Sequence, residues 1–243
     1  MQARLSRWLK NPIGNLRQLG WRTLAWLQGL AQKPTDSYRK HNAQFMEPDS
    51  LEKHRRMFAQ IQADDLFNHS ENKFGALLAR FPAVRGIAVD IGCGGGWLAA
   101  RLAHEGFARV IGIEPSATGL DIARELFPPA RYPQIEWRRG LAEEQLPLLM
   151  LDRPTLFVTG CVLAHLTDDA VAQICATLER VAPVGSILGF SEPWGPAAHR
   201  FMWHVRTPAW WCAHLPSWKL DFHGTPIENV PGRHKGFHGV RVR

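Results

Sequence analysis

The glycine-rich stretch at residues 89–97 constrains the fold of this chain more than any other feature. It reads Val-Asp-Ile-Gly-Cys-Gly-Gly-Gly-Trp and overlaps a short apolar run at residues 86–91. Glycine adopts left-handed backbone angles without strain and lets a ligand approach the main chain closely. In open α/β sheets such a turn lies at the carboxyl ends of the strands, where ligands bind. The sequence therefore predicts a strand, a ligand-binding turn and a helix here.

Apolar runs and helical patterns alternate over residues 84–190, which is typical of a parallel sheet with helices on both faces. We expect strands at residues 86–91, 109–113, 134–138, 155–160 and 186–190. We expect helices at residues 97–104, 117–126 and 168–181. Two weaker strand patterns, at 218–222 and 239–243, fit a closing antiparallel pair. The predicted fold class is α/β, a Rossmann-like, doubly wound, mostly parallel sheet with an N-terminal helical extension.

The chain divides into four predicted segments. Residues 1–35 form a basic amphipathic segment and residues 36–83 a helical cap. Residues 84–190 form the α/β domain, and residues 191–243 a substrate-side segment with the closing strands. The tryptophans between positions 194 and 218 fit either an aromatic wall over a ligand or a second small core.

The net charge of +7 lies in the first 40 residues, which hold eight of the 29 basic residues and one of the 22 acids. The rest is neutral, so its composition does not predict a basic nucleic-acid groove. Residues 1–35 fit a helix packed on the domain or on a partner, or a peripheral contact with the inner face of a membrane. No apolar run approaches the roughly 20 residues of a membrane span. Four cysteines without metal-ligand spacing are typical of a cytoplasmic protein.

Two acids and one tryptophan indicate which ligand the turn binds. The dinucleotide pattern G-x-G-x-x-G, begun at Gly92, requires glycine at position 97, which is tryptophan here. Asp90 precedes the turn, and an acid there suits the cationic amino-acid end of a ligand better than a pyrophosphate. Glu114 ends the next strand, 24 residues later, where a carboxylate can accept hydrogen bonds from both ribose hydroxyls.

These residues belong to a series of motifs that resembles the class I S-adenosylmethionine (SAM)-dependent methyltransferases. VDIGCGGG resembles their first motif, and GIEPS at residues 112–116 resembles the motif after the second strand. RRGLAEEQLP at 138–147 and TGCVLAHL at 159–166 resemble the segments after the third and fourth strands. The small-molecule branch, which includes ubiquinone-pathway methyltransferases, is the most similar. The resemblance implies SAM as the cofactor.

The resemblance also implies a set of cofactor contacts. The glycine turn passes under the methionine part of SAM, Glu114 holds the ribose, residues 141–143 flank the adenine, and Cys161 lies near the sulfonium. The residues so assigned are Asp90, Gly92, Cys93, Gly94, Gly96, Glu114, Pro115, Leu141, Ala142, Glu143 and Cys161. The chain departs from the family where Leu141 replaces a frequent aspartate and Ala164 a frequent glutamate.

Methyl transfer from a sulfonium is an in-line displacement that requires alignment and no metal. A hydroxyl acceptor benefits from a general base, and the two candidates are His165, just past the fourth strand, and Glu192, just past the fifth. The spacing of His199, His204 and His214 does not match a zinc pair, so no metal site is expected.

The expected function is O-methylation of a small-molecule, lipid-linked or glycan acceptor. One alternative is an RNA methyltransferase that binds through the basic N-terminal arm. Nucleic acid is nonetheless an unexpected partner, because TGCV replaces the N/D-P-P-Y motif after the fourth strand. The other alternative is a non-catalytic partner or scaffold protein that keeps the fold.

Overall fold

The computed structural model describes Glu52 and residues 85–160, 162–192, 194–195, 198–200, 203–223 and 236–243. The predicted segments 1–35 and 36–83 therefore lie outside the described residues, apart from Glu52, and so does Cys161. Within the described part of the chain, no helix has the length and apolar character needed to cross a membrane.

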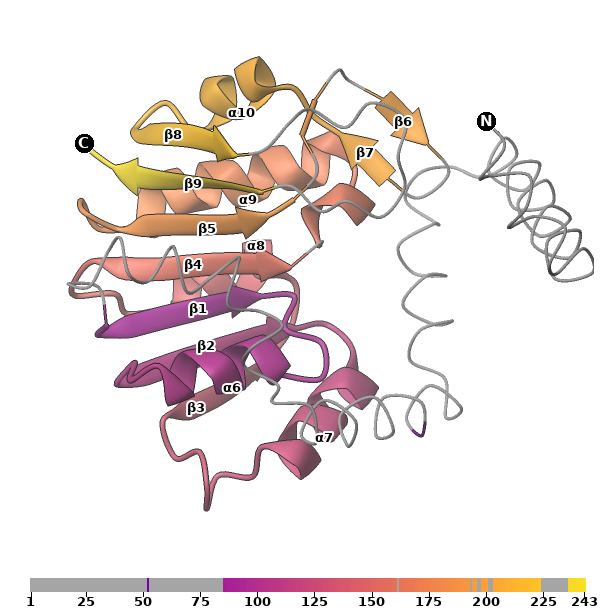
Figure 1. The fold of residues 1–243 in the computed structure, drawn as a ribbon, viewed down its shortest axis with the longest axis vertical. Coiled ribbons are helices and arrows are strands. Elements are labelled where there is room, and N and C mark those ends of the chain that lie inside the picture. The colour runs from indigo at the N-terminus through magenta and orange to yellow at the C-terminus, as the bar shows by residue number, and fades with distance from the viewer. Residues whose placement is uncertain are drawn as a thin grey trace, which may run out of the picture.

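Seven strands form one mixed sheet. Its order is β3 (Ile135–Arg139), β2 (Arg109–Glu114), β1 (Ile87–Ile91), β4 (Thr155–Gly160), β5 (Ile187–Ser191), β9 (Gly236–Arg241) and β8 (Trp218–His223). The first five strands are parallel, while β9 runs antiparallel to both β5 and β8 (Figure 1). The predicted doubly wound sheet and its closing antiparallel pair are both confirmed.

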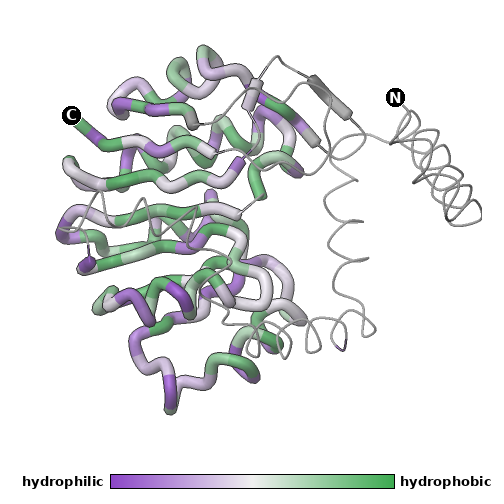
Figure 2. Tube along the Cα trace, viewed as in Figure 1, coloured by the Kyte–Doolittle hydropathy of each residue, from purple (hydrophilic) through white to green (hydrophobic). Residues whose placement is uncertain are grey.

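Helices cover both faces of the sheet, because side chains alternate along each strand. On one face, Val89 and Phe157 pack with α9 (Asp168–Val181), α10 (Pro208–His214) and the turn η2 (Leu146–Leu148), which follows α8 (Ala142–Gln145). On the other face, Ala88 and Val158 pack with α6 (Trp97–His104) and with Phe127, which follows α7 (Ala117–Leu126). Figure 2 shows hydrophobic residues concentrated along these central strands, as expected for a sheet buried on both sides.

Helices α7 and α9 begin directly after a residue whose side chain caps them. Ser116 Oγ accepts a hydrogen bond from the amide of Gly119 at the start of α7, over 3.1 Å. Thr167 Oγ1 does the same for Ala170 at the start of α9, over 3.3 Å. These local caps explain why α7 and α9 begin at the predicted residues.

The chain reverses its winding direction between β1 and β4. From β1 it moves outward through β2 to β3, and it then returns to β4 on the other side of β1. Ligands of doubly wound folds bind outside the carboxyl ends of the strands at this point. Two short elements lie near that edge, the turn η3 (Leu163–His165) after β4 and the pair of β6 (Ala198–Arg200) and β7 (Trp203–Val205) (Figure 1).

The tryptophans of the C-terminal region belong largely to the main core. Trp194, Trp211 and Trp218 are buried and pack in the same cluster as Phe190 and Phe237. Trp211 contacts the ring of Phe237 with centroids 4.8 Å apart. The core interpretation therefore holds for these three tryptophans.

Trp137 on β3 explains why glycine occupies one position in the sheet and one at the start of α6. A Cβ on Gly112 of β2 would lie 2.6 Å from the Trp137 ring, and a Cβ on Gly96 would lie 2.5 Å from it. Both distances are shorter than carbon atoms tolerate, so the indole occupies the space that two missing side chains leave. Trp137 thus packs the second strand against the start of α6.

We predict that Gly112→Ala destabilises the protein by about 1–3 kcal/mol through overpacking against Trp137. Urea unfolding followed by circular dichroism measures the change. Gly160→Ala is the matched control, because a Cβ on Gly160, also in a strand, would meet nothing within 4 Å. Equal effects of the two substitutions would contradict the packing role of Trp137.

Candidate active site

The glycine turn after β1 is held against the end of β2. The amides of Gly92 and Cys93 both donate to the carbonyl oxygen of Ile113, over 2.8 and 3.0 Å. Gly92, Gly94 and Gly96 have φ angles of 72°, 51° and 82°. Side chains other than glycine rarely adopt this left-handed conformation, so the backbone requires glycine at all three positions.

The three glycines differ in what surrounds them. A Cβ on Gly92 would lie 2.5 Å from Val162 Cγ2, and one on Gly96 would strike Trp137. A Cβ on Gly94 would meet no described atom within 4 Å. Gly92 and Gly96 therefore make close packing possible, whereas Gly94 presents its backbone to open space.

The Glu114 side chain connects the glycine turn to the residue that caps α7. Its Oε2 accepts from the amide of Gly94 over 3.0 Å, and its Oε1 accepts from the amide of Ser116 over 2.9 Å. Burial raises the pKa of the Glu114 carboxyl, and these two hydrogen bonds partly offset the rise. Each carboxylate oxygen keeps further acceptor capacity, as the recognition of two neighbouring hydroxyls requires.

Asp90 is a buried acid with an unsatisfied oxygen. Its side chain is 1% exposed, and its Oδ2 has no hydrogen-bond partner among the described residues. Its pKa is raised to about 7, mainly by burial and to a smaller extent by the charge of Glu114, while a hydrogen bond from the backbone of Ala99 opposes the rise. A buried carboxylate without a partner is costly, and a cationic ligand group would remove the cost.

The two cysteines assigned to the cofactor differ in what the structure describes. Cys93 is buried, and burial together with the charges of Asp90 and Glu114 raises the pKa of its thiol far above the usual range. Its side chain is therefore a neutral, apolar wall of the glycine turn. Cys161 lies outside the described residues.

The segment after β3 reaches the same edge as Glu114. The amide of Gly140 donates to the backbone oxygen of Glu114 over 3.2 Å, which places residues 141–143 beside the end of β2. Leu141 is 37% exposed at the start of α8, and its amide donates to the carboxylate of Glu144 over 3.2 Å. Ala142 and Glu143 are half-buried in the first turn. The structure thus brings these residues together with Asp90, the glycine turn and Glu114.

The predicted base candidates have different environments. His165 is half-buried at the end of η3, directly past the carboxyl end of β4. Glu192 is 1% exposed and accepts four hydrogen bonds from residues 159–164. Burial raises the pKa of the Glu192 carboxyl, and these bonds oppose the rise. A base role for either residue stays a prediction.

Arg206 contacts this region but carried no sequence signal. It is 2% exposed and follows β7, more than 40 residues after the η3 turn whose carbonyl oxygens it binds. An isolated arginine in an aromatic segment matches no motif, so only the fold reveals the contact. The described residues contain no group of three or more histidine, cysteine, aspartate or glutamate side chains arranged to hold a metal ion.

Comparisons with known proteins give one family match and several structures with a similar fold. Residues 88–185 match the family described as "Methyltransferase domain". A sugar N-methyltransferase from a Streptoalloteichus species is 16% identical, with a TM-score of 0.56 over 78% of this chain and 93% of that one. A SAM-bound amino pentose methyltransferase of calicheamicin biosynthesis from Micromonospora echinaspora is 12% identical, with a TM-score of 0.56 over 77% and 96%.

A third similar structure is a TehB-like SAM-dependent methyltransferase from Corynebacterium glutamicum. It is 17% identical, with a TM-score of 0.54 over 81% of this chain and all of that one. At these identities the structures establish the fold that the family match also indicates. No curated protein sequence matches the chain.

We predict that Asp90→Asn stabilises the ligand-free protein at pH 8 and much less at pH 5. With a folded pKa of about 7, Asp90 stays protonated in the native state where the unfolded chain has lost that proton. The free energy of unfolding therefore falls as pH rises from about 4 to 7, by up to about 4 kcal/mol, and asparagine removes this loss.

Urea unfolding at the two pH values measures this effect. Asp121→Asn on α7 is the control, because the Asp121 side chain is 74% exposed and pairs with Arg124 at the surface. A stabilisation by Asp90→Asn that is equal at pH 5 and pH 8 would show that Asp90 does not titrate as its burial implies.

Proposed function

We propose that this chain, which carries a class I SAM-dependent methyltransferase domain with its family match at residues 88–185, methylates a hydroxyl group of a small polar acceptor. SAM is its cofactor. The observation that carries the site assignment is that Oδ2 of the buried Asp90, two residues before the glycine turn, has no hydrogen-bond partner among the described residues. A buried carboxyl at this position fits a ligand that is cationic at one end.

The residues at the sheet edge fit the parts of SAM in order. Asp90 would face the amino-acid ammonium group, directly or through water, and Gly94 would lie under the methionine part. Glu114 would accept the ribose hydroxyls with its two oxygens. Leu141, Ala142 and Glu143 would flank the adenine, where the exposed Leu141 supplies apolar contact and no side-chain acceptor. When bound there, the cofactor supplies a methyl group activated by its sulfonium.

His165 is the proposed general base. Its turn follows β4, which lies next to β1 in the sheet, so the acceptor rim adjoins the glycine turn. The imidazole would take the hydroxyl proton as the acceptor oxygen bonds to the methyl carbon, while the carbon–sulfur bond of the sulfonium would break and leave a neutral thioether. General-base catalysis typically contributes about 10²- to 10⁴-fold in rate. The remaining acceleration would come from alignment within a site that excludes water.

The acceptor class is proposed as a small molecule or glycan rather than a nucleic acid. Two of the similar structures are described as acting on a sugar and on an amino pentose. A lipid-linked acceptor and a membrane contact through residues 1–35 remain a hypothesis, because those residues lie outside the described part of the chain. Binding of the full chain to anionic vesicles tests that contact.

We predict that Gly94→Ala weakens binding of S-adenosylhomocysteine at least tenfold. Its Cβ would project into the open space assigned to the ligand, while the left-handed backbone angle costs folding about 1 kcal/mol. Isothermal titration calorimetry measures the affinity, which we expect to be micromolar in the wild type.

Gly106→Ala is the matched control for backbone strain. Gly106 follows α6, also has a positive φ, and its Cβ would likewise meet no described atom within 4 Å. It should share the loss of stability and keep the wild-type affinity. A folded wild type that does not bind the ligand would instead favour the non-catalytic scaffold alternative.

We predict that His165→Gln lowers kcat for a hydroxyl acceptor about 10²- to 10⁴-fold and leaves the affinity for S-adenosylhomocysteine unchanged. The measurement is transfer of labelled methyl from SAM to a panel of hydroxylated and amino sugars. An amine that is already deprotonated needs no base, so activity on amino sugars would depend little on His165. Transfer to amines alone would overturn the O-methylation proposal.

A further inference from the structure

The turn that carries His165 is held from one side by Glu192. The carboxylate oxygen Oε1 accepts from the amides of Val162 and Leu163, over 2.9 and 3.1 Å, and from Thr159 Oγ1 over 2.7 Å. The second oxygen, Oε2, accepts from the amide of Ala164 over 3.0 Å. Three consecutive amides before His165 thus converge on one buried carboxylate.

Arg206 holds the same turn by its carbonyl oxygens. Its guanidinium donates to the carbonyl oxygens of Leu163 and Leu166, over 2.9 and 2.7 Å, and to the carboxylate of Asp168 over 2.9 Å. The rings of Trp210 and Trp211 lie 5.1 and 5.9 Å from the guanidinium carbon, within cation–π range. His165 therefore lies between two carbonyl groups that one arginine fixes.

Two buried ions on one short turn require a reason beyond stability. Removing a charge from water is costly, and well-packed apolar groups often stabilise a fold as well as a buried ion pair does. Charge-assisted hydrogen bonds are, however, shorter and more directional than neutral ones. Burial lowers the pKa of the Arg206 guanidinium, and the charges of Asp168 and Glu192 oppose this fall, so Glu192 helps to keep Arg206 charged.

We propose that Glu192 and Arg206 are positioning residues, which together hold the backbone of residues 162–168 so that His165 keeps one orientation at the acceptor rim. This inference rests on the proposed function, in which His165 acts as the base. It gives Glu192 a positioning role in place of the base role predicted from the sequence. Three of the four hydrogen bonds given above come from amides of this turn and the fourth comes from Thr159 at the end of β4, and Glu192 is only 1% exposed, so its carboxylate is occupied by the protein.

Ring signals of His165 test the positioning without any acceptor. The full-length chain, saturated with S-adenosylhomocysteine and labelled at histidine, gives imidazole resonances that His165→Gln identifies. In Glu192→Gln the side-chain NH₂ group would face backbone N–H groups of the turn. Both are hydrogen-bond donors, so at least one hydrogen bond to the turn would be lost. In Arg206→Lys the compact ammonium group lacks the planar fork of the guanidinium. It cannot bind Leu163, Leu166 and Asp168 at the same time. We expect both variants to shift or broaden the His165 signals and to change their pH titration, while ligand affinity stays within twofold.

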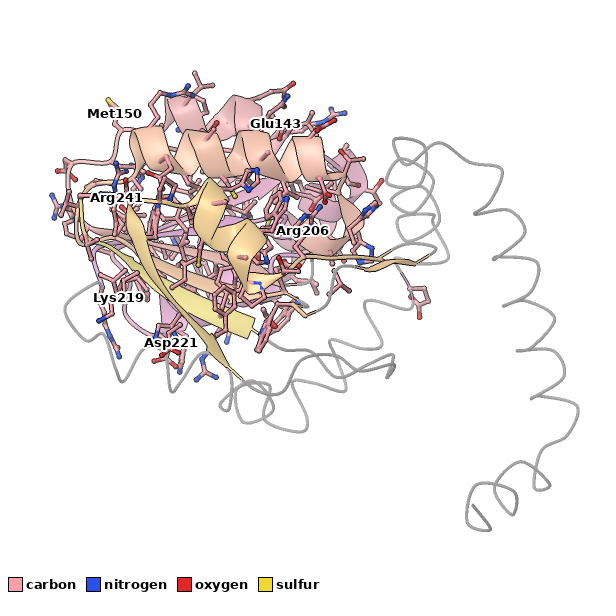
Figure 3. The ribbon with its side chains drawn as sticks, turned by 90° about the horizontal axis from the view of Figure 1, so that it is seen from above. Glu143, Met150, Arg206, Lys219, Asp221 and Arg241 are labelled. Atoms are coloured by element: carbon pink, nitrogen blue, oxygen red, sulfur yellow. The ribbon has the colours of Figure 1, made fainter. Side chains whose placement is uncertain are left out.

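Two matched controls use the same chemistry at sites away from the rim. Arg241 donates to the carbonyl oxygens of Leu178, Glu179 and Ala182 near the end of α9, at the other end of that helix from Arg206 (Figure 3). Glu179 accepts from the amide of Ser217 over 3.0 Å. Arg241→Lys and Glu179→Gln should leave the His165 signals unchanged, even where they lower stability.

A kinetic cycle then separates positioning from general destabilisation. With an acceptor found by the methyl-transfer panel, Glu192→Gln should lower kcat about 10- to 100-fold. In a His165→Gln background it should lower kcat less than twofold, because the group through which it acts is already gone. Fully additive effects would overturn the proposal.

The outcomes distinguish this inference from the proposed function. Unchanged ring signals in folded Glu192→Gln and Arg206→Lys would overturn the positioning role, whatever the activity. Changed signals beside a fully active His165→Gln would support the positioning and overturn the base. If Glu192→Gln does not fold, Arg206→Lys and the milder Asp168→Asn still decide, because the Asp168 side chain is 43% exposed and forms one of the contacts of Arg206.

Discussion

Three parallel strands carry an acidic side chain at or near their carboxyl ends, and folding buries all three. How each buried acid is hydrogen-bonded determines what this edge of the sheet can do. Glu192 after β5 accepts four hydrogen bonds, Glu114 at the end of β2 accepts two, and Asp90 near the end of β1 keeps an oxygen without a described partner. Buried carboxylates are stable only when partnered. We therefore assign Glu192, which accepts the most hydrogen bonds, a structural role, and the oxygen of Asp90 that lacks a described partner marks where we propose that a ligand completes the site.

At Asp90, the stability of the ligand-free protein conflicts with the proposed binding of a cationic ligand. The carboxyl of Asp90 ionises only near neutral pH, since burial and the charge of Glu114 oppose its ionisation. The ligand-free fold thus favours the proton, whereas the proposed cationic ligand favours its loss. The domain retains a group that weakens the empty protein because the same group would recognise the cofactor.

The sequence predicted the local features well and the long-range ones poorly. Capping by Ser116 and Thr167 is local, so the bounds of α7 and α9 were predicted to the residue, whereas β3 begins one residue later than expected. The different roles of Gly92 and Gly96 depend on Val162 and Trp137, which arrive from other strands. Arg206 reaches its partners across the fold, so no spacing in the chain could indicate it.

Val162 links the two halves of the proposed site physically. Its side chain packs where Gly92 has no Cβ, and its amide donates to Glu192, so one residue contacts both the glycine turn and the anchor of the His165 turn. In-line transfer requires donor, acceptor and base to be aligned within fractions of an ångström. Because close packing leaves no room for a side chain at position 92, one placed there would displace Val162, at the start of the His165 turn. The missing side chain at Gly92 therefore lets the proposed cofactor and acceptor sites lie next to each other.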